Sequence, residues 1–81
     1  MSFDKLRTYI LELEPKIIIL NNKVNVVNYE KIEHFDNHKI IIKTSNKIIV
    51  INGSNLIITK LLKDELLIEG IIKGLELNEQ N

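Results

Sequence analysis

Short apolar segments dominate the second half of the chain, and turn-forming residues separate them. Four such segments follow one another: Ile48–Ile51, Leu56–Ile58, Leu66–Ile68 and Ile71–Leu77. Runs of this length, rich in Ile and Val and bounded by Asn, Gly, Ser and Asp, are typical of β-strands. Because the connections are too short for helical crossovers, we expect neighbouring strands to be mostly antiparallel.

The strand pattern begins further upstream. Apolar residues fill Ile17–Leu20 and Ile40–Ile42, and Val24 alternates with polar neighbours until the pattern breaks at Val27. A β-bulge near Val27–Glu30 would restore one common face to this stretch. The pattern therefore predicts strands from residue 16 onwards.

Pairs of Asn, Asp, Ser and Gly mark the expected turns between these strands. They are Asn21-Asn22, Asp36-Asn37, Ser45-Asn46, Asn52-Gly53 and Lys63-Asp64. Asn-Gly is the strongest short hairpin signal, and here it stands between two Ile-rich runs. We therefore expect Asn52 and Gly53 to form a structural turn in which Gly53 has a positive φ.

One amphipathic helix is predicted before the strands, over residues 2–14. Apolar side chains recur there at spacings of three and four, at Phe3, Leu6, Ile10 and Leu13. Pro15 ends the helix because proline disfavours helical geometry at the residue before it. An isolated helix of three turns is not stable in water, so this apolar stripe is a candidate interaction site, for the sheet or for a partner.

The sequence thus predicts an all-β fold, mostly antiparallel, with six to seven short strands in a small sandwich or roll and one short N-terminal helix. We expect a single domain over 1–81, made of the helix at 2–14, a β domain at 16–77 and a polar tail at 78–81. Ile40–Ile42 and Ile48–Ile51 do not alternate, which is typical of strands covered on both faces. Either the sheet curls on itself or a second copy supplies cover, and we expect some of both, hence a homo-oligomer.

Composition excludes several classes of function. Eleven basic and eleven acidic residues give a net charge of zero, which argues against general nucleic-acid binding. Cysteine is absent, so disulfides and thiolate metal sites are excluded. The longest apolar runs have four residues, far below the roughly 18 needed to span a bilayer. With no targeting segment visible, we expect a cytoplasmic protein without direct membrane insertion.

Candidate chemistry is sparse. His34, Asp36 and His38 would share a face of an extended strand, but the turn expected at Asp36-Asn37 breaks that register, so we predict no metal site. Asp64, Glu65 and Glu69 could be paired carboxylates, but no base or nucleophile accompanies them. We therefore predict no catalytic residues and no cofactor.

Glycines and lysines have structural explanations as well. Gly70 and Gly74 lack the Lys-Ser/Thr of a phosphate loop and are expected to mark a bulge or close backbone approach. The lysines flank or interrupt the apolar runs, where they can block edge-to-edge aggregation: Lys39, Lys43, Lys47 and Lys60.

The order of these elements resembles the YabP/YqfC family of small sporulation proteins. The likeness rests on Lys16–Asn22 as first strand and tight turn, Val24–Phe35 as a long second strand, Lys39–Thr44 as third, and the Asp64–Gly70 element before the last strand. The resemblance covers roughly Pro15 to Glu79. One departure is Ser45-Asn46, where the family tends to have Gly; Asn also tolerates positive φ.

The resemblance implies a non-enzymatic assembly or interaction factor in spore envelope (coat or cortex) formation in the mother cell. It also implies a membrane-protein partner at the forespore surface, which would place the chain at the periphery of that membrane. The alternative is a small β-barrel that binds a ligand or RNA. A basic groove with exposed aromatic rings would favour that alternative, and an apolar self-complementary face would favour assembly.

Overall fold

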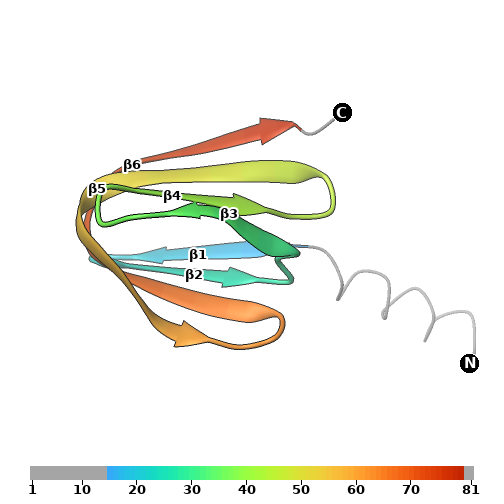
Figure 1. Ribbon diagram of the computed structural model, residues 1–81, viewed down its shortest axis with the longest axis horizontal. Coiled ribbons are helices and arrows are strands. Elements are labelled where there is room, and N and C mark those ends of the chain that lie inside the picture. Colours follow the sequence, from blue (N-terminus) through green and yellow to red (C-terminus); the bar gives the residue numbers. More distant parts are fainter. Residues whose placement is uncertain (1–14, 80–81) are drawn as a thin grey trace, which may run out of the picture.

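The computed structural model describes residues 15–79, which form one six-stranded antiparallel sheet folded on itself into two layers (Figure 1). The strands are β1 (Lys16–Leu20), β2 (Lys23–Val27), β3 (Lys31–Phe35), β4 (Lys39–Lys43), β5 (Lys47–Leu61) and β6 (Glu65–Glu79). The all-β prediction is therefore confirmed. The helix expected at 2–14, with its stripe of Phe3, Leu6, Ile10 and Leu13, lies outside the described residues.

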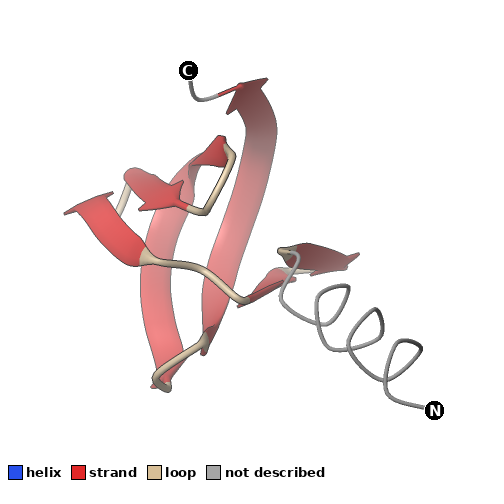
Figure 2. Cartoon of the chain, turned by 90° about the vertical axis from the view of Figure 1, so that its right-hand side faces the viewer, coloured by secondary structure: helices blue, strands red, loops and turns tan. Residues whose placement is uncertain are grey.

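The order of strands across the sheet is β1-β2-β6-β5-β4-β3, so the last two strands of the chain lie at its centre. Both have 15 residues, and Figure 1 shows that both bend near their middle. The first part of β5 pairs with β4 and with the end of β6, as in Ile49↔Leu77. The second part pairs with the start of β6, as in Ile58↔Ile68, and β2 extends that layer. Figures 1 and 2 show the resulting two layers joined by the bend.

The bend depends on glycines that let two backbones approach closely. A Cβ on Gly53 would overlap the Ile71 carbonyl oxygen. Gly70 has a φ of 140°, and a Cβ there would lie 2.6 Å from the Asn55 carbonyl oxygen. Asn55 itself takes a φ of 54°, in the left-handed region that asparagine tolerates. The ladder between β5 and β6 shifts register on either side of these residues. Gly70 thus makes the close approach that the sequence predicts.

The prediction of a turn at Asn52-Gly53 is wrong. Both residues lie inside β5, where Asn52 pairs with Gly74 and Gly53 with Ile72 across a register shift. The positive φ values of residues 15–79 fall at Asn28, Asn55 and Gly70, and Gly53 is not among them. Gly53 is needed for space rather than for backbone conformation. The four short segments predicted between residues 48 and 77 are accordingly two long, bent strands.

The long second strand expected over Val24–Phe35 is also two strands. β2 ends at Val27 and β3 begins at Lys31, and they lie at different places in the sheet. The segment between them crosses from one layer to the other (Figure 2). The Asn28 N–H donates to the Asp64 carbonyl at 2.6 Å, and the Glu30 N–H donates to the Lys43 carbonyl at 2.8 Å. The crossing segment is therefore hydrogen-bonded to both layers.

The polar tail is predicted over 78–81, but its first two residues belong to β6, and residues 80–81 lie outside the described part of the chain. β6 continues through Asn78 and Glu79, which pair with Ile48 and Lys47. The Lys47 ammonium lies 2.8 Å from the Glu79 carboxylate, so a charge pair supports the last residue of the strand.

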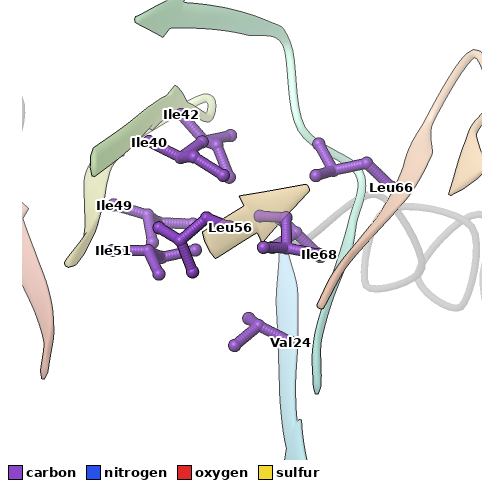
Figure 3. Packing of buried hydrophobic residues seen from close by; sticks show 9 residues of the cluster. Val24, Ile40, Ile42, Ile49, Ile51, Leu56, Leu66 and Ile68 are labelled. Atoms are coloured by element: carbon purple, nitrogen blue, oxygen red, sulfur yellow. The ribbon is translucent and has the colours of Figure 1, made fainter. Parts of the chain in front are cut away.

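Nine apolar side chains fill the space between the layers (Figure 3). Strands β4 and β5 contribute one group, strands β2 and β6 another, and Leu56 lies at the bend between them. The full set is Val24, Val26, Ile40, Ile42, Ile49, Ile51, Leu56, Leu66 and Ile68, each at most 1% exposed. Burial of this kind stabilises by roughly 25 cal/mol per Å² of apolar surface.

The non-alternating Ile runs place branched side chains on both faces of the sheet. Ile40 and Ile42 point into the core, whereas Ile41 between them is half-buried on the outer face. There it is paired across the strands with Val50, which is also half-buried. The curling of the sheet thus covers one face of these runs, as predicted, and cross-strand pairing shields part of the other.

We predict that Gly53→Ala lowers the free energy of unfolding by about 1–3 kcal/mol, because the added methyl group would force the Ile71 backbone away. Gly74→Ala is the matched control, since a Cβ there meets no atom within 4 Å. Urea denaturation of both variants measures the difference. Equal stability of the two variants would contradict the close approach at the bend.

Candidate interaction surface

Strand β1 forms one edge of the sheet in the described part of the chain, with β2 as its neighbour there. A tight turn at Asn21-Asn22 sets its register, as the sequence predicts, and pairs Ile17 with Val26 and Ile19 with Val24. An edge strand presents a row of backbone donors and acceptors to whatever lies beside it.

Three consecutive apolar side chains of β1 are exposed. Ile18 is 49% exposed, Ile19 57% and Leu20 58%. Ile18 points to the outer face with Asn25, whereas Ile19 shares the inner face with the buried Val24 but lies at the margin of the core. Lys16 is the one charged residue of the strand. This surface, Ile18–Leu20 together with the free edge of β1, is called the β1 edge below.

A second apolar feature is a hollow of about 270 Å³ between the two layers. It is lined by Pro15, Ile17, Thr44, Lys47, Ile49 and Leu77. The Thr44 hydroxyl both donates to and accepts from the backbone of Lys47, at 3.1 and 3.0 Å. The Lys47 ammonium is paired with Glu79, so both polar side chains of the wall have partners.

The histidine cluster forms the turn between β3 and β4. Asp36 Oδ1 accepts hydrogen bonds from the backbone N–H groups of His38 and Lys39, at 2.7 and 2.8 Å. Its other oxygen lies 2.8 Å from His34 Nε2. The His34 contact and the two backbone N–H groups lower the pKa of Asp36 from 3.8 to about 2. Residues 15–79 contain no group of three or more His, Cys, Asp or Glu side chains placed to hold a metal ion.

The candidate carboxylates make different contacts. Glu65 accepts from the Asn25 amide at 3.0 Å and lies 3.9 Å from the Lys60 ammonium. Glu69 accepts from the Thr59 hydroxyl at 2.9 Å. Asp64 belongs to the predicted turn between β5 and β6. These contacts of Glu65 and Glu69 link neighbouring strands, so both carboxylates have structural partners.

A more polar hollow lies where the segment between β2 and β3 meets the β4–β5 and β5–β6 turns. It is lined by Asn28, Tyr29, Glu30, Ser45, Lys63 and Asp64. The Tyr29 hydroxyl donates to the Leu62 carbonyl at 2.6 Å, which holds the ring in place. Its single lysine is accompanied by two acids, so this hollow is not basic.

The model of the YabP family matches residues 12–81, so the chain belongs to the YabP family. No curated protein and no solved structure matches the chain. In the described part of the chain, no helix is both long and apolar enough to cross a membrane.

Sequence reasoning did not single out the β1 edge. The run Ile17–Leu20 looks like the other Ile-rich runs, and its exposure depends on strand order, which places it at a margin. The available signal was its position as the first strand of the chain, since the lysine at its start is shared by β2 to β5.

We predict that the contribution of the Asp36 charge to stability is present above about pH 4 and is lost as pH falls towards 2. The sign follows because the folded-state pKa is lowered, so the ionised form is the one that folding favours. The thermal unfolding midpoints of the parent and of Asp36→Asn, measured from pH 6 to 2, should converge at the acid end. A difference that stays constant across that range would contradict the role of the charge.

Proposed function

We propose that this chain is a non-enzymatic sporulation protein that acts in the mother cell as an assembly or interaction factor in spore envelope formation. Membership of the YabP family supports the sporulation role. The observation that carries the interaction role is the β1 edge, where three consecutive apolar side chains are about half exposed. Exposed apolar surface of this kind marks sites of protein association.

Within this proposal the chain forms a homo-oligomer through the β1 edge. If two copies of β1 pair antiparallel about a twofold axis at Ile18, then Ile18 faces its own copy and Ile17 faces Ile19. Every pair at the centre is then apolar, and Lys16 lies at the margin opposite Leu20. The β1 edge is thus self-complementary in both side chains and backbone hydrogen bonding.

The proposed place of action is the cytoplasm of the mother cell, at the periphery of the forespore membrane, through a membrane-protein partner. The protein would neither insert into the bilayer nor bind nucleic acid. The alternative, a ligand- or RNA-binding barrel, calls for a basic groove with exposed aromatic rings. One of the two hollows described above is mainly apolar and the other has more acidic than basic residues, so the observations favour assembly.

We predict that the parent chain sediments as more than a monomer at micromolar concentration, and that Ile18→Lys shifts it to the monomer. Ile18 points outward, so the substitution places a charge at the centre of the proposed pairing without entering the core. Sedimentation equilibrium measures the mass.

Ile71→Lys is the matched control because Ile71 is exposed to a similar degree, at 56%, but lies on β6 beside the bend. It should leave the oligomer intact. A monomeric parent, or an oligomer that Ile18→Lys leaves unchanged, would exclude the β1 edge as the interface.

We further predict that deleting the gene leaves vegetative growth unchanged and reduces the yield of heat-resistant spores. Complementation with the parent gene should restore the yield. A tagged chain from sporulating cells should capture an envelope or forespore-membrane protein, whereas vegetative cells should yield none. Normal spores combined with poor growth in the deletion strain would refute the sporulation role.

A further inference from the structure

The apolar hollow between the layers lies where the described chain begins. Pro15 and Ile17, at the start of β1, line one wall, and Leu77, near the end of β6, lines another. Figure 1 shows that β1 starts and β6 ends at the side of the molecule opposite the bend. The chain that precedes Pro15 therefore starts from the wall of this hollow.

The hollow is suited to aliphatic side chains. Ile49 lies within it fully buried, whereas Leu77 is 51% exposed, so the cavity is apolar inside and open at its mouth. Its polar atoms are already engaged, because Thr44 bonds to the Lys47 backbone and the Lys47 ammonium pairs with Glu79. An occupant would gain by burying hydrocarbon rather than by hydrogen bonding.

We propose that residues 1–14 of the same chain dock in this hollow through their apolar stripe. Fourteen residues precede Pro15, and the stripe of Phe3, Leu6, Ile10 and Leu13 needs an apolar surface to cover it. In a helix, with a rise of 1.5 Å per residue, Ile10 would be about 8 Å along the axis from Pro15, and Pro15 lines the same hollow as Leu77. Ile10 and Leu13 are thus the side chains that enter.

The same segment of a second copy is the less favoured occupant. A segment tethered at the wall has an effective concentration on the order of millimolar, well above a micromolar partner. Of β1, only Ile17 lines the hollow, whereas Ile18, at the centre of the proposed pairing, points to the opposite face. The inference consequently does not depend on the proposed function.

Disulfide trapping tests the docking in the full-length chain, which contains no native cysteine. Ile10→Cys is combined with Leu77→Cys, and Glu12→Cys with Leu77→Cys is the matched control. Residue 12 has the shorter tether to Pro15 but lies on the opposite side of the predicted helix from Ile10. Oxidation is followed on non-reducing gels, where a disulfide within one chain speeds migration and one between chains doubles the mass.

We expect the Ile10/Leu77 pair to close within one chain roughly tenfold faster than the control, because docking holds the two sulfurs together. A second pair, Ile10→Cys with Lys47→Cys, tests another wall should the first variant lose its β-sheet circular dichroism. Closure no faster than the control in folded protein would overturn the proposal. Disulfides formed mainly between chains would also overturn it, by assigning the hollow to a second copy.

Discussion

The fold depends on how closely the backbones of β5 and β6 approach at their common bend. Gly53 lies against the Ile71 carbonyl and Gly70 against Asn55, where any side chain would force the strands apart. The two hairpin turns contact this point too, since the Gly70 N–H donates to the Asn22 carbonyl and the Leu56 N–H to the Asn37 carbonyl. These contacts fold one sheet into two layers, and the core exists because the layers then face each other.

That folding also decides which apolar residues stay exposed. Residues on the inner faces of the two layers are completely buried. Ile40, Ile51 and Ile68 are examples. The outer strand β1 reaches past the core, so Ile19 stays exposed although it points to the same side as Val24. The β1 edge and the apolar hollow are thus consequences of strand order and of the length of the bent strands, rather than of local sequence.

Local patterns predicted what local forces determine. The turns at Asn21-Asn22, Asp36-Asn37, Ser45-Asn46 and Lys63-Asp64 fall where the sequence placed them. The prediction of a turn at Asn52-Gly53 was wrong because Asn-Gly shows only that a tight turn is possible. Strand β6 pairs with β5 on both sides of the bend, and this pairing makes a continued strand more favourable. The prediction of one long strand over Val24–Phe35 was wrong for a similar reason. A crossing between layers and a bulge within one strand interrupt the alternation of apolar and polar residues in the same way.

The position of the last two strands at the centre of the sheet has a consequence for synthesis on the ribosome. The β1–β2 and β3–β4 hairpins emerge first, but each is only a margin of the finished sheet, and they make contact with each other through β5 and β6. An isolated hairpin is marginally stable in water. The chain therefore cannot close its core until the first part of β6, with Leu66 and Ile68, has left the exit tunnel, and its Ile-rich hairpins stay open to nascent-chain chaperones until then.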